Sequence, residues 1–151
     1  MRRHILRTSL ITPPDPSQKL FSVDEANKLL PVIAPLVEQL QGLHASTLKA
    51  NDELNAVVAK LSAGNGYPLK ELQTQAAQLA QHQLHLVEAF QSACRQLEEL
   101  GAVLKDLSQG LVDFYAIRDG DLVFLCWRLG EDKIRYWHTL DSGFSARQPL
   151  P

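Results

Sequence analysis

The chain has 151 residues, of which 45% are hydrophobic and 21% are charged, and its formal net charge is −2. This balance is typical of one globular domain with its own core, and it excludes an intrinsically disordered chain. No run approaches the roughly 18 consecutive apolar residues of a membrane-spanning helix, so we expect no membrane association.

The first twenty residues differ in charge from the rest of the chain. Residues 1–20 have a net charge of +3, and their three prolines predict a flexible or extended arm. Proteins that bind nucleic acid usually present a broad basic surface, because neutralised phosphates supply most of their affinity. A short arm is not such a surface, so nucleic acid is not expected as the main partner. The basic residues of the arm are Arg2, Arg3, Arg7 and Lys19.

A first long helix is predicted to begin after Ser22. Ser22 is a suitable N-cap, and Glu25 three residues later can complete a capping box. Apolar residues then recur in steps of three and four, as in an amphipathic helix. Pro31 and Pro35 predict a break or kink, because each removes a backbone hydrogen bond.

A second helix follows the turn-forming stretch "SAGNGYP" at residues 62–68. Its apolar period runs from about residue 69 to residue 100, and Gly101 is placed to end it. Two helices joined by so short a turn lie antiparallel. Residues 21–101 are therefore expected to form a long helical hairpin.

The pattern changes after Gly101 to short alternating stretches, "GLVDFYAI", "DLVFLCW" and "KIRYWH". Asp119-Gly120 predicts a tight hairpin turn between the first two. The expected fold is α+β, a helical hairpin packed on a three-stranded antiparallel β-meander. We expect residues 21–151 to form a single domain, with the meander and tail at 102–151.

The predicted turns also imply a strand register, which sorts side chains onto two faces. The first turn places Asp113 opposite Cys126, and a second turn at 129–132 would place Cys126 opposite Arg135. The apolar face, which includes Tyr136 and His138, is expected to pack on the helices. The other face is polar and aromatic, with Asp113, Tyr115, Phe124, Cys126, Arg128, Lys133, Arg135 and Trp137.

Several motifs together resemble one family. They are "FSVDEANKLLP", "KDLSQGLVDF", "LCWRLGE", "YWH" and "GFSARQPL". The chain resembles DUF2203, a bacterial family of domains of unknown function, over about residues 21–150. The resemblance implies no reaction. It marks as family motif positions Asp113, Cys126, Trp127, Gly130, Glu131, Trp137, His138 and Arg147.

The leading interpretation is a cytoplasmic, non-enzymatic interaction module. The sheet covers only part of the helical hairpin, so its exposed apolar stripes favour a homodimer. The Cys126–Arg128–Arg135–Trp137 face would bind a protein partner or a small anionic ligand. With Cys94 and Cys126 in different elements and no CxxC spacing, a disulfide framework is not expected.

The alternative interpretation is a metal-binding protein or enzyme. Cys126, His138, Glu131 and Asp113 carry donor atoms that suit zinc or another transition metal. The predicted register separates His138 from Cys126, so no cofactor is expected under the leading interpretation. A structural Cys126 is favoured over a reactive thiolate.

Arg147 is expected to tie the C-terminal tail to the sheet by pairing with Asp113 or Glu131. The candidate binding residues are Asp113, Cys126, Arg128, Glu131, Arg135, Trp137, His138 and Arg147.

Overall fold

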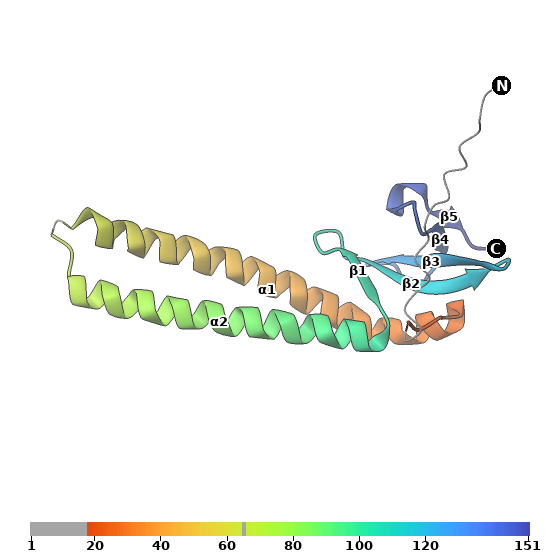
Figure 1. Ribbon diagram of the computed structural model, residues 1–151, viewed down its shortest axis with the longest axis horizontal. Helices are drawn as coiled ribbons and strands as arrows, with labels where there is room; N and C mark the ends of the chain where they lie inside the picture. The colour runs from red at the N-terminus through yellow and green to blue at the C-terminus, as the bar shows by residue number, and fades with distance from the viewer. Residues whose placement is uncertain (1–17, 65) are drawn as a thin grey trace, which may run out of the picture.

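A computed structural model describes residues 18–64 and 66–151. Most of the arm predicted at residues 1–20 lies outside the described residues. The two helices pair as the predicted antiparallel hairpin, and a sheet lies against one end of it (Figure 1). The elements are α1 (Val23–Ala63), α2 (Leu69–Leu100), β1 (Val103–Asp106), β2 (Leu111–Arg118), β3 (Asp121–Arg128), β4 (Tyr136–Thr139), the 3-10 helix η1 (Phe144–Ala146) and β5 (Gln148–Pro149).

The N-terminus of α1 is capped as its sequence predicts. The Ser22 hydroxyl accepts a hydrogen bond from the Glu25 N–H at 3.1 Å, which satisfies one of the free donors of the first turn. Phe21 is buried directly before the cap, with its ring 5.3 Å from that of Phe114. The start of α1 is therefore fixed to the sheet.

The predicted break at Pro31 and Pro35 is wrong, because α1 is continuous from Val23 to Ala63. Both prolines are on the exposed side of the helix. The carbonyl groups that lose a helical partner there can bond to water instead. Ile33 and Val37 on the opposite side are fully buried, and their packing holds the helix together.

The C-terminus of α2 ends at Gly101, as predicted. Gly101 has φ +86°, a left-handed conformation that residues with a side chain rarely adopt. Its N–H and that of Ala102 bond to the carbonyl oxygens of Glu98 and Leu97. A β-carbon at Gly101 would also lie only 2.9 Å from the ring of Phe21. The chain can therefore turn sharply from α2 into the sheet.

The sheet has five antiparallel strands in the order β1-β2-β3-β4-β5, and not the three that we expected. The added strands β1 and β5 are short and lie at the two edges. Neither has a long alternating pattern, and both are strands because they pair with a longer neighbour. The predicted α+β class with an antiparallel sheet is thus confirmed, but the sheet has two more strands than predicted.

The β2–β3 hairpin has the predicted register. Asp119 and Gly120 both have positive φ, at 50° and 84°, as a two-residue turn of this twist requires. Arg118 pairs with Asp121, and Asp113 pairs with Cys126.

The predicted register of β4 is wrong by one residue. Cys126 pairs with Tyr136 and not with Arg135, and Phe124 pairs with His138. The loop before β4 is held by a long-range contact, in which the Ile134 N–H donates to Asn27 Oδ1 of α1 at 2.8 Å. A shift of one residue moves every side chain of a strand to the other face. Tyr136 and His138 therefore face away from the helices, whereas Trp137 packs towards them.

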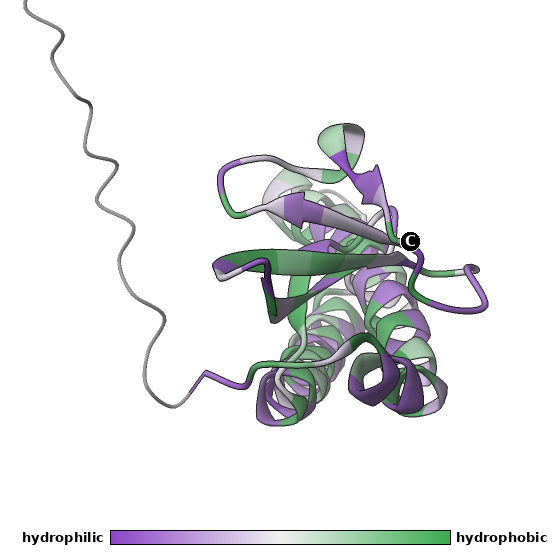
Figure 2. Ribbon diagram, turned by 90° about the vertical axis from the view of Figure 1, so that its right-hand side faces the viewer, coloured by the Kyte–Doolittle hydropathy of each residue, from purple (hydrophilic) through white to green (hydrophobic). Residues whose placement is uncertain are grey.

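The core lies between the inner face of the sheet and the adjoining ends of both helices. Figure 2 looks along the helices and shows the sheet across their end. The far part of the hairpin projects away from the sheet, so its helices cover only each other (Figure 1). The fully buried side chains of the core include Trp127, Phe114, Ile33, Leu40, Leu97, Val37 and Val112.

Replacing Ile33 by Ala should lower the free energy of unfolding by about 2–5 kcal/mol, because it leaves a cavity in the core. The neighbouring Val32 is 51% exposed, so Val32→Ala should change it by less than about 0.5 kcal/mol. Urea unfolding followed by circular dichroism measures both values. Equal effects would contradict the packing described for α1.

Candidate functional site

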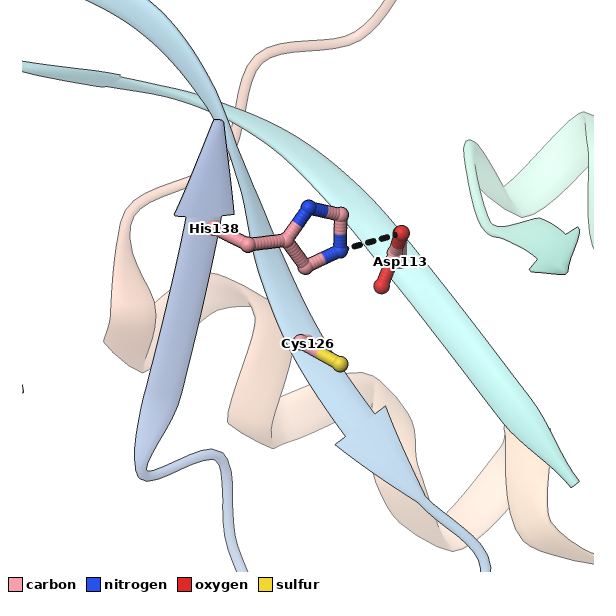
Figure 3. Close-up of side chains that lie close together, drawn as sticks. All are labelled: Asp113, Cys126 and His138. Carbon is pink, nitrogen blue, oxygen red and sulfur yellow. Dashed lines mark hydrogen bonds and ion pairs between the residues drawn. The ribbon is translucent and has the colours of Figure 1, made fainter. Parts of the chain in front are cut away.

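A buried polar cluster lies on the outer face of the sheet. Asp113 on β2, Cys126 on β3 and His138 on β4 are only 2%, 1% and 2% exposed. One potential ligand atom from each lies within 4.8 Å of the others (Figure 3). The register of β4 produces this arrangement, because His138 pairs with Phe124, two residues from Cys126 on the same face. We call these three residues the polar cluster.

The hydrogen bonds of His138 define its tautomer. Its Nδ1 is 2.8 Å from the carbonyl oxygen of Thr139, which can only accept, so Nδ1 carries a proton. Its Nε2 is 2.8 Å from Asp113 Oδ2. If Nδ1 carried the only proton of the ring, Nε2 and Asp113 Oδ2 would both be hydrogen-bond acceptors, and no proton would lie between them. The pair therefore holds a further proton, on either Nε2 or Asp113.

Asp113 has an unsatisfied oxygen atom. Its Oδ1 is buried and has no hydrogen-bond partner among the described residues. Burial raises the pKa of the Asp113 carboxyl, and His138, the Cys126 thiol and Lys105 oppose this rise in part. An unpaired buried polar atom costs about 1–3 kcal/mol, so the fold carries an uncompensated acceptor at this point.

The Cys126 thiol is strongly protected from ionisation. Burial, followed by the charge and contact of Asp113, raises its pKa from 9.0 to about 12, although the Arg147 guanidinium lowers it in part. A reactive cysteine needs the opposite shift, because the thiolate is the nucleophile. The metal-free site therefore does not support nucleophilic catalysis by Cys126.

The segment after β4 covers the polar cluster. Arg147 donates to Glu131 Oε1 at 3.0 Å, and its guanidinium carbon lies 4.0 Å and 4.1 Å from the ring centres of Tyr136 and Phe144. The predicted attachment of the tail is present, with Glu131 as the partner and through a single hydrogen bond. Glu131 also accepts from the Arg128 N–H at 2.7 Å.

A small cavity of about 90 Å³ lies between this cover and the polar cluster. Lys105 of β1, which no sequence motif indicated as a site residue, lines it. The Lys105 Nζ is 4.2 Å from the centre of the Phe124 ring. The cavity is lined by Lys105, Leu111, Asp113, Cys126, His138, Ser142, Gly143 and Phe144.

Five of the eight candidate residues, Arg147 of the cover among them, do not join the polar cluster. Arg135 is exposed and pairs with Asp132, so the predicted row of Asp113, Cys126 and Arg135 is wrong. Trp137 lies on the helix side of the sheet, with the Arg118 guanidinium 4.9 Å from its ring. Arg128 is exposed, and Glu131 is held by Arg147. Of the four ligands in the alternative interpretation, three come together and Glu131 does not.

The fold and the cluster define an α+β protein with buried Asp, Cys and His side chains on one sheet face. A family model described as "Uncharacterized conserved protein (DUF2203)" matches residues 19–150. The chain therefore belongs to the DUF2203 family, as its motifs indicated. A search of curated proteins and a search of solved structures each found no match.

Within residues 18–64 and 66–151, no helix combines the length and the apolar character needed to cross a membrane.

The raised pKa of Cys126 predicts its behaviour in alkaline titration. In metal-free Cys94→Ala protein, thiolate absorbance should stay absent through pH 10, about one unit above the ordinary pKa, and develop only towards pH 12. The unfolded chain ionises this thiol near its ordinary pKa, so stability should fall as the pH rises from 9.0 towards 12. In denaturant the same thiol should titrate normally. A native thiolate signal at or below pH 9.0 would contradict the assignment.

Proposed function

We propose that the protein binds a divalent transition-metal ion, zinc by the chemistry of the donors, through Asp113, Cys126 and His138. The observation that carries the proposal is the meeting of these three donors in one buried place beside an unpaired carboxylate oxygen. Zinc is bound in proteins by cysteine sulfur, histidine nitrogen and carboxylate oxygen. Metal–ligand bonds of about 2.0–2.3 Å in a tetrahedral site set donor atoms about 3.3–3.7 Å apart. His138 Nε2 and Asp113 Oδ2, now 2.8 Å apart, would therefore separate slightly to admit the ion.

The state of each donor supports this proposal. The His138 Nδ1–H donates to a backbone carbonyl, the contact that commonly orients metal-binding histidines and leaves Nε2 for the ion. A bound ion would take the place of the extra proton between His138 and Asp113. It would also replace the proton of the Cys126 thiol, since a coordinating thiol is deprotonated. The unpaired Asp113 Oδ1 would gain a partner.

Three protein ligands leave a fourth position for water or another ligand. Structural zinc sites are usually closed by four protein side chains, whereas sites that act on a substrate keep one position open. In this chain Glu131, which could have been a fourth ligand, is held by Arg147 and Arg128. The donor set therefore favours an open site, which could activate a bound water by lowering its pKa.

The strand register does not support the binding face that the sequence predicted at Cys126, Arg128, Arg135 and Trp137. Arg135 and Trp137 do not share a face with Cys126, so an aromatic and arginine-rich patch of these residues does not form. The cytoplasm remains the proposed location, because the site needs a reduced thiol and both cysteines are free.

Self-association through the helical hairpin is a second proposal with its own observation. Leu48, Leu84 and Val87 are 53%, 55% and 43% exposed on the part that projects from the sheet. They lie within about one helical turn of the Gln83–Asn51 hydrogen bond, at one level of the hairpin. A homodimer would bury them.

Metal content tests the first proposal. Full-length protein purified without an affinity tag, exchanged against zinc and then desalted, should retain about one zinc ion per chain. Cys126→Ala and His138→Ala should each lose most of it, because each removes a ligand. Elemental analysis measures the zinc, and circular dichroism checks that the variants fold.

The matched controls are Cys94→Ala and His85→Ala, which remove the same residue types outside the polar cluster. Both should keep the zinc of the wild type. Zinc-free wild-type protein, or unchanged zinc in the Cys126 and His138 variants, would overturn the proposal.

Sedimentation equilibrium tests self-association. The wild type should be a dimer, and Leu48→Gln/Leu84→Gln should shift it towards the monomer because polar side chains no longer gain from burial. Ile117, an apolar side chain of the sheet that is 55% exposed, provides the control Ile117→Gln, which should stay dimeric. A monomeric wild type would refute this second proposal.

A further inference from the structure

We infer that the open position of the metal site takes a small monovalent anion, a carboxylate or an oxyanion of about three or four non-hydrogen atoms. The inference rests on the proposed metal site and names the ligand that this site would select. It is carried by three observations: the size of the cavity beside the polar cluster, the balance of charge around it, and the position of Lys105.

The cavity limits the size of the ligand. Its volume of about 90 Å³ compares with about 30 Å³ for one water molecule in the liquid. Space for roughly three waters accommodates a formate or bicarbonate ion and is too small to enclose an aromatic ring. Leu111 and Phe144 supply apolar walls, and Gly143 brings the backbone of the covering segment to the opening.

The charges around the cavity leave one positive charge unmatched. The two charges of a divalent ion would be balanced by the carboxylate of Asp113 and the thiolate of Cys126. The guanidinium of Arg147 is balanced by Glu131 at 3.0 Å. Lys105 lines the same cavity and forms no ion pair within the part of the chain that the structure describes.

Lys105 is placed to pair with a ligand and not to hold the fold. Its side chain is exposed at the opening, and its Nζ lies 4.2 Å from the centre of the Phe124 ring. This contact directs the ammonium group over the outer face of the sheet, where its charge already acts on Asp113. An anion bound at the open position would therefore lie in a cavity that both the metal ligands and Lys105 line.

Anion titration of the cobalt-substituted protein tests the inference. Cobalt(II) occupies sites of this kind and gives visible absorption bands that change with its ligands. Full-length protein reconstituted with cobalt is titrated with sodium formate or sodium benzoate at constant ionic strength. Formate should shift the bands with saturation, and benzoate should not.

The variant Lys105→Met removes the charge and keeps an unbranched side chain that is one atom shorter. It should still bind cobalt, because Lys105 is not a ligand, but should bind formate about five- to tenfold more weakly. Lys133→Met removes an exposed lysine that does not line the cavity, and it should behave as the wild type.

The other possible results refute either the anion site alone or the anion site and the metal site together. Formate affinity unchanged in Lys105→Met, loss of cobalt from that variant, or benzoate binding as tightly as formate would refute the anion site. Cobalt bands that respond to neither anion would refute it as well and leave the metal site standing. Absence of cobalt bands from the wild type would refute the metal site and the anion site together.

Discussion

His138 reaches Asp113 only because β4 pairs with β3 in the observed register. In a sheet, a shift of one residue carries each side chain to the opposite face. In the alternative register His138 would lie in the core against the helices, and Trp137 would lie beside Cys126. The Asn27–Ile134 hydrogen bond fixes the loop before β4, and Glu131 closes the start of that loop against Arg128. The polar cluster thus depends on a contact between the sheet and α1.

The cost of burying the polar cluster explains why the site attracts a cation. Burial raises the pKa of both Asp113 and Cys126, and Asp113 Oδ1 has no hydrogen-bond partner among the described residues. Groups in this state gain most from a positive charge placed among them, because the surrounding medium screens it weakly. Ser142, Gly143 and Phe144 cover the cluster, and Arg147 holds this cover through Glu131 and two aromatic rings.

The features that depend on residues close together in the sequence could be predicted correctly. Ser22 and Gly101 marked the helix ends because caps act within a few residues, and Asp119-Gly120 set the β2–β3 register because its turn permits few alternatives. Asp113 and Cys126 were accordingly placed side by side from the sequence alone.

The rest depended on contacts between distant residues. The register of β4 follows from Asn27 bonding to a residue 107 positions away, which no local pattern reveals. Lys105 was missed because β1 is four residues long and becomes a strand only by pairing with β2. Without the true register of β4, the sequence predicts the cysteine and the histidine on opposite faces.

X-ray absorption at the zinc edge of the loaded protein identifies the atoms that bind the ion. Zinc in the polar cluster should have one sulfur ligand at about 2.3 Å, with nitrogen and oxygen ligands at about 2.0–2.2 Å. A zinc shell with no sulfur would place the ion outside the polar cluster. Two or more sulfur ligands would require cysteines that the cluster does not contain. Either of these two results would show that Asp113, Cys126 and His138 are not the zinc ligands.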